Sequence, residues 1–144
     1  MTPSLPNQTL TSRNTELIAA FSLLFSKAKG FYQQHAETAG SGNLRRHFAA
    51  LAELHQQTLD LLPKPGQSEV TSDELDALNE LSLWYENKRS PTALAAIKHQ
   101  LIKQLQLQKA VIRNFDLQQY QKTLLHFTAS LQIAADQLAE IKAC

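Results

Sequence analysis

Five side chains that can bind metal ions or transfer protons lie close together between Tyr32 and Gln57. They are the imidazoles of three histidines and the carboxylates of two glutamates: His35, His47, His55, Glu37 and Glu53. Imidazole nitrogen suits transition metals, and carboxylate oxygen suits harder cations. Whether these groups converge on a metal ion depends on the elements that carry them.

The apolar spacing predicts an all-α fold. A first helix begins near Ser12 or Asn14 and ends at the glycines of Gly40-Ser41-Gly42, where we expect a left-handed glycine. Later helices are predicted over 43–62, from Ser72 to near 90, over 91–114, and from Asp116 to the end of the apolar run. The predicted stripes are spaced by three and four residues, as in a helix with one buried face. No alternating strand pattern occurs.

The turn lengths predict how these helices are connected. Two short turns make two antiparallel hairpins, and one long connection, which contains the short third helix, joins them. Such a connection allows the second and third main helices to run parallel, as in a ferritin-like four-helix bundle with a short extra helix in the long crossover. A plain up-down bundle with a decorated loop is the alternative.

Length and composition are typical of one small globular domain. The chain has 144 residues, and we expect a flexible arm over 1–11 and a single helical domain over 12–144. The formal net charge of +1 favours neither nucleic acid nor membrane as a partner. The one cysteine, Cys144, cannot form an internal disulfide. The first residues lack the pattern of a signal peptide and no run has membrane-spanning length, so a cytoplasmic protein is predicted.

The first predicted hairpin resembles that of a bacterial family of uncharacterised ferritin-like domains. The resemblance is carried by a glycine-aromatic pair, an Ala-Glu pair, a short turn and spaced apolar residues: Gly30-Phe31-Tyr32, Ala36-Glu37, 40–43, Leu44, Phe48, Ala52 and Leu61. The ending AADQLAEIKA is similar to the last helix of that family. The resemblance implies a ferritin-like fold and supplies no function.

The carboxylates do not form the pattern that a dinuclear metal site needs. Such a site in a bundle takes a Glu from each of two helices and a Glu-x-x-His from each of the other two. Glu37 points away from the apolar stripe of its helix, and Glu53 should face water and is followed by Gln56 rather than a histidine. The helix predicted over 91–114 has no acidic residue. We therefore predict neither a dinuclear metal centre, nor a cofactor, nor a catalytic residue.

His35 and His47 should lie level with each other near the first turn, because hairpin positions pair with numbers that sum to about 82. Two histidines without a carboxylate would make a weak transition-metal site. The alternative is that they are partly buried histidines hydrogen-bonded at the end of the bundle.

A layer of uncharged polar residues is predicted midway through the core. Its candidates occupy or adjoin apolar faces and fall at similar levels along the bundle: His55, Gln104, Gln108 and Thr123. Buried amides and imidazoles must find partners, because an unsatisfied one costs about 1–3 kcal/mol. The layer is either structural and fixes helix register, or an altered ligand pocket.

Two surface features add candidate interactions. Lys98, Lys109 and Arg113 share one flank of the fourth helix, which is either a solvated basic face or a weak nucleic-acid contact. Trp84 and Tyr85 either dock the crossover helix on the bundle or contribute to a subunit contact.

We predict a non-catalytic ferritin-like bundle that acts as a binding, structural or stress-related regulatory module. Its partner would be an unidentified protein, or a second copy in a homodimer formed through helix faces or the crossover helix. The first alternative is a metal-binding or oxidative protein with atypical histidine ligands. The second is a weak nucleic-acid binder that uses the fourth helix.

Overall fold

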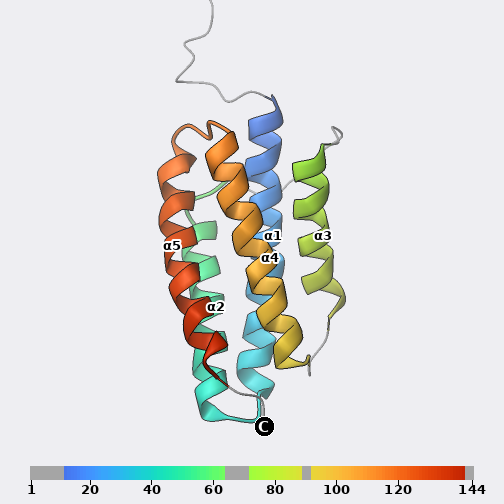
Figure 1. Ribbon diagram of the computed structural model, residues 1–144, viewed down its shortest axis with the longest axis vertical. Helices are drawn as coiled ribbons and strands as arrows, with labels where there is room; N and C mark the ends of the chain where they lie inside the picture. Colours follow the sequence, from blue (N-terminus) through green and yellow to red (C-terminus); the bar gives the residue numbers. More distant parts are fainter. Residues whose placement is uncertain (1–11, 64–71, 89–91, 142–144) are drawn as a thin grey trace, which may run out of the picture.

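The computed structural model describes residues 12–63, 72–88 and 92–141, and in these residues the chain is all-helical with no strand. The prediction of an all-α fold is therefore confirmed. Figure 1 shows the helices side by side with their long axes roughly aligned. Their bounds are α1 Ser12–Thr38, α2 Gly42–Leu59, α3 Asp73–Asn87, α4 Leu94–Asn114 and α5 Tyr120–Ala139. The predicted N-terminal arm, Pro91 and Cys144 lie outside the described residues.

The helices form a closed ring in the order α1, α2, α5, α4, α3. α1 packs against α2 and α3, α5 packs against α2 and α4, and α3 also contacts α4. Following the colours of Figure 1, α2 and α4 run in the same direction. α3, which lies between them in the chain, runs in the opposite direction along the bundle. Each helix is thus antiparallel to the helix that precedes it in the chain.

α1 is buried on two faces rather than on the one that its sequence predicted. The spacing of three and four residues places Phe21 and Leu24 on the predicted apolar stripe of this helix, and both are buried as expected. A second set, Ile18, Phe25 and Tyr32, is fully buried as well. The reason is that α1 has neighbours on two sides, α2 and α3, so a single apolar stripe could not cover its contacts.

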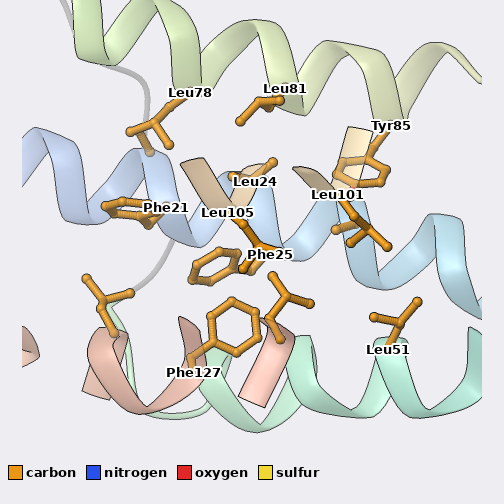
Figure 2. Close-up of a cluster of buried hydrophobic side chains, with 14 of the residues drawn as sticks. Phe21, Leu24, Phe25, Leu51, Leu78, Leu81, Tyr85, Leu101, Leu105 and Phe127 are labelled. Atoms are coloured by element: carbon orange, nitrogen blue, oxygen red, sulfur yellow. The ribbon is translucent and has the colours of Figure 1, made fainter. Parts of the chain in front are cut away.

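α3 belongs to the core although its sequence places it inside a connection. Figure 2 shows Leu78 and Leu81 of α3 pointing toward Phe21 and Leu24 of α1. Leu78 is fully buried, and full burial of such a side chain contributes about 1.5–3 kcal/mol. The helix is therefore a packed element of the ring, and Tyr85 is among the residues that dock it.

Serine residues cap α2 and α3. Ser72 lies at the helix start that the sequence predicted, whereas Ser41 was assigned to the end of the preceding helix. The Ser41 side chain accepts a hydrogen bond from the backbone N–H of Leu44, and Ser72 accepts one from Leu75 in the same way. The prediction of a left-handed glycine before α2 was wrong, because no described glycine has a positive φ. The chain turns there through the extended backbone of Ser41, with φ −112° and ψ 143°.

α5 begins four residues later than Asp116, the predicted start. The Asp116 carboxylate instead accepts hydrogen bonds from the backbone N–H and the side-chain amide of Gln118, at 3.1 and 3.2 Å. Gln118 has a φ of 56°, in the left-handed region, and this reverses the chain before Tyr120. Asp116 therefore stabilises a turn rather than a helix start. The turn is tied to α1 by Asn14, whose side-chain amide donates to the Asp116 carbonyl at 2.6 Å.

Candidate functional site: a buried polar network

His55 lies at the centre of the bundle and is fully buried. Its ring is surrounded by the rings of Phe25, Tyr32 and Phe127, with centroids 5.7, 5.7 and 5.1 Å away. Nδ1 lies 2.7 Å from the carbonyl oxygen of Leu51, which can only accept, so Nδ1 carries the proton. Nε2 is then an acceptor. Burial lowers the pKa of His55 to about 4, because water no longer solvates the charged imidazolium.

The side chain of Gln104 links three neighbours at this centre. Its Nε2 donates to Nε2 of His55 at 3.1 Å and to Oε1 of Gln108 at 2.9 Å, so both amide protons are used. Its Oε1 accepts from the hydroxyl of Tyr85 at 2.7 Å. Gln104 is fully buried on α4, and the three partners come from α2, α4 and α3.

Gln108 extends the network to α5. Its Nε2 donates to Oγ1 of Thr128 at 2.9 Å, and the Thr128 hydroxyl donates to the carbonyl of Leu124 at 2.7 Å. A Thr hydroxyl bonded to the carbonyl four residues earlier is a common arrangement within helices. The end of the network is therefore a backbone acceptor rather than an open polar group.

Two tyrosines extend the network to α1. The hydroxyl oxygens of Tyr32 and Tyr85 are 2.9 Å apart, and Tyr85 uses its own proton on Gln104, so Tyr32 is the donor of this pair. Burial raises the pKa of both hydroxyls above the usual value for tyrosine. Both groups are therefore neutral donors over the physiological pH range.

The network joins all five helices through uncharged groups, and each donor in it meets an acceptor of a neighbouring group. The direction of donation is consistent throughout: from Tyr32 through Tyr85 to Gln104, and from Gln104 to His55 on one side and through Gln108 to Thr128 on the other. Hydrogen bonds in a water-poor interior are strong, and leaving one unmade is costly. The geometry therefore suits holding the five helices in one register. It presents neutral donors and acceptors, which is not the ligand set that hard cations select.

The structure brings together most residues of the predicted polar layer. His55, Gln104 and Gln108 lie within one network. Thr123 lies elsewhere, half-buried in a groove between α2 and α5 that Leu54 also lines. Thr128 provides the contribution of α5 instead.

Sequence reasoning missed Thr128, Tyr32 and Tyr85 as members of this layer. Thr128 could have been found, because it is four residues after Leu124 and three before Leu131, on the buried stripe of α5. The two tyrosines carried no such signal, because their hydroxyls meet only when α3 packs on α1.

The other two histidines of the segment between Tyr32 and Gln57 lie nearer the α1–α2 turn. His35 is buried, stacks on Phe31 with centroids 4.1 Å apart, and donates from Nδ1 to the carbonyl of Phe31 at 2.9 Å. Its Nε2 is buried without a hydrogen-bond partner among the described residues. His47 is half-buried. No group of three or more His, Cys, Asp or Glu residues placed to hold a metal ion occurs within the described ranges.

The two glutamates of the opening stretch are both exposed. Glu53 accepts a hydrogen bond from Gln57 one turn later on α2, at 3.2 Å. Neither carboxylate points into the bundle centre.

Two cations of the predicted basic flank are bonded to α5. Lys98 donates to the backbone carbonyls of Ala139, the last residue of α5, and of Ile141, two residues after it. Lys109 donates to Oε1 of Gln132 at 2.7 Å. These lysines therefore tie α4 to α5, and cations are favourable near a helix C-terminus.

Within the described residues, each helix is too short or too polar to cross a lipid bilayer. Comparison of the chain with protein-family models, with curated proteins and with solved structures finds no match.

Proposed function

We propose that this chain is a non-catalytic bundle that acts by binding a protein partner, as a structural or regulatory module. One observation carries the proposal: the central network takes a neutral polar side chain from each of the five helices, and these side chains hydrogen-bond to one another. A substrate or metal ion at this centre would have to displace bonds that are already made. The surfaces of the bundle are therefore the better place for its activity.

We also propose that α1, α2, α4 and α5 correspond to the four helices of a ferritin-like bundle. The support is the direction of the helices: two antiparallel hairpins, with α2 and α4 parallel and the connection between them running the length of the molecule. In this comparison α3 is an extra helix in the connection between α2 and α4, and it packs against α1 and α4. On this assignment the bundle interior, where metal-binding ferritin-like proteins have inward-pointing carboxylates, holds neutral side chains instead.

A second candidate function rests on the unpartnered Nε2 of His35. A buried imidazole nitrogen with a free lone pair is a potential metal ligand, and His47 is the second ligand that the sequence predicted. This supports the alternative of an atypical histidine-based metal site. The third candidate, a nucleic-acid contact through α4, has weaker support because Lys98 and Lys109 bond to α5.

Metal loading separates the first two candidates. Protein purified without chelator or affinity tag is dialysed against Fe²⁺, Mn²⁺ or Zn²⁺, and bound metal is measured by elemental analysis. The binding-module proposal expects no stoichiometric metal. One ion per chain, lost in the variant with His35→Ala and His47→Ala but kept in His99→Ala, would replace it with the metal-binding function. His99 is a suitable control because it is exposed on α4.

A duplex-binding assay tests the third candidate. Fluorescence anisotropy with labelled DNA and RNA duplexes at low salt is expected to give no saturable binding. Salt-sensitive binding that Arg113→Ala abolishes would favour the nucleic-acid function instead.

A further inference from the structure

The outward face of α5 carries an apolar stripe on the surface of the described chain. Leu125 and Ile133 are 52% and 62% exposed, although a soluble helix usually turns such side chains inward. Ala129 lies midway between them and is also exposed. The stripe borders a shallow groove of about 750 Å³ along α4 and α5, with Ile112 among its lining residues. A surface of this kind is typical of a protein contact.

The stripe is self-complementary about Ala129. Leu125 and Ile133 lie four residues before and after it, and Lys122 and Asp136 lie seven residues before and after it. At about 100° per residue, these four positions point within about 40° of the direction of Ala129. All five residues are exposed. The helix thus presents one face on which apolar and charged groups are arranged symmetrically, with opposite charges at its two ends.

We propose that this face is the interface of a homodimer, in which two α5 helices pack antiparallel across a two-fold axis at Ala129. In that arrangement a residue of one copy faces the residue of the second copy whose number brings the sum of the two to 258. Leu125 then contacts Ile133 of the second copy, and Lys122 faces Asp136 of the second copy. Both contacts occur twice, as the two-fold axis requires. The small side chain of Ala129 allows the two backbones to approach at the axis.

Charge complementarity favours a second copy over an unrelated occupant. A partner with an acidic helix would complement Lys122 but oppose Asp136, whereas a second copy complements both. Lys109 and Arg113 line the α4 side of the groove, where long cationic side chains can keep their charges in water. The interface does not depend on the proposed function, because a bundle with any activity could form it.

The contact is short, and this sets its expected strength. From Gln121 to Gln137 the helix is about 24 Å long at 1.5 Å per residue. One helix pair of this length lies below the roughly 1,200–2,000 Å² that stable interfaces bury. The dimer is therefore expected to form reversibly, with a dissociation constant in the micromolar range or weaker.

Exchanging the two charges tests the pairing. Lys122→Glu places a glutamate opposite each Asp136, and Asp136→Lys places a lysine opposite each Lys122. Each single variant should weaken dimerisation by roughly tenfold, because two weakly favourable pairs become repulsive. The double variant, with both substitutions, should recover the affinity of the original chain. Sedimentation velocity over a concentration series measures all four proteins.

Three results would overturn the proposal. The original chain could remain monomeric at millimolar concentration. The double variant could dimerise no better than the single variants, or the single variants could leave the affinity unchanged. Circular dichroism of each variant confirms folding, and the recovery in the double variant cannot arise from misfolding.

Cross-linking tests the position of the axis. In a Cys144→Ser background, Ala129→Cys should form a disulfide-linked dimer on mild oxidation. Helix axes 8–10 Å apart, with Cα atoms at a radius of about 2.3 Å, bring two facing Cα atoms to about 3.4–5.4 Å, and the upper part of this range allows a disulfide. Ala49→Cys is the matched control, because Ala49 is also exposed but lies on α2. Equal cross-linking of both variants would refute the proposed axis.

Discussion

Replacing Gln104 with leucine should be among the most destabilising changes in this protein. Gln104 accepts from Tyr85 at 2.7 Å and donates to His55 and Gln108 at 3.1 and 2.9 Å. Leucine is similar in size but makes none of these bonds, so three buried groups lose a partner. At about 1–3 kcal/mol for each group, the loss is about 3–9 kcal/mol. Local rearrangement and the added apolar burial offset part of it, and we expect about 3–5 kcal/mol.

Gln106→Leu is the control, because it makes the same chemical change on the same helix at an exposed position. Urea unfolding followed by circular dichroism gives the free energy of unfolding of each variant. The control should stay within about 0.5 kcal/mol of the original chain. If Gln104→Leu costs no more than Gln106→Leu, the three bonds do not stabilise the fold and the argument from the network fails.

A double-mutant cycle separates the network from simple packing. Tyr85→Phe removes only the hydroxyl that donates to Gln104. If the two groups act through that bond, the cost of Tyr85→Phe in the Gln104→Leu background should be smaller than in the original chain by about 0.5–3 kcal/mol. Additive costs would show that Tyr85 and Gln104 stabilise the protein independently.

The remaining predictions concern pH, capping and the packing of α3. His55 is neutral in the fold with a pKa of about 4, whereas an unfolded histidine has a pKa of about 6.5. Its contribution is therefore complete above pH 6.5, and the free energy of unfolding should fall by about 3 kcal/mol from pH 6.5 to 4. Urea unfolding across this range should show a smaller decrease for His55→Gln, and an equal decrease would contradict the assignment. Ser72→Ala should cost about 1 kcal/mol in the same assay, because the N–H of Leu75 loses its cap; no change would mean that water replaces the cap. Leu78→Ala should cost about 2–5 kcal/mol in thermal or urea unfolding, and Leu83→Ala, which is half exposed, much less. Equal costs would indicate that α3 is only loosely attached.

The parts of the fold that depend on local spacing could be predicted from the sequence. Ser72 was expected at a helix start, and it caps α3 by accepting a hydrogen bond from the backbone N–H of Leu75. The apolar stripe of α4, with Leu101 and Leu105, is buried as its spacing indicated. Such signals need only a few residues on one helix, so they do not depend on the arrangement of the others.

The parts that depend on two helices meeting could not be read in the same way. Periodicity marked one face of α1, but the burial of Ile18 and Phe25 requires neighbours on both sides. Thr123 was the predicted α5 member of the polar network, but Thr128 takes that place. The two residues are five positions apart on one helix, so they differ both in height along the bundle and in the direction of their side chains. The late start of α5 follows from the left-handed Gln118, a conformation that few residues other than glycine adopt and that the sequence around Asp116 did not indicate.

This bundle has polar side chains at its centre and apolar side chains on the outer face of α5, and both placements depend on which partners the side chains have. A polar group in the core must have a specific partner, so each helix that contributes one is held at a single level against its neighbours. The apolar groups on the outer face of α5 are not needed for that purpose, because the core is filled by the aromatic and aliphatic side chains around Phe25 and Phe127. The exposed parts of Leu125 and Ile133 thus add nothing to the stability of one chain, and they lower the free energy only when another surface covers them. The symmetric placement of Lys122 and Asp136 around them makes a second copy of the chain the surface that fits.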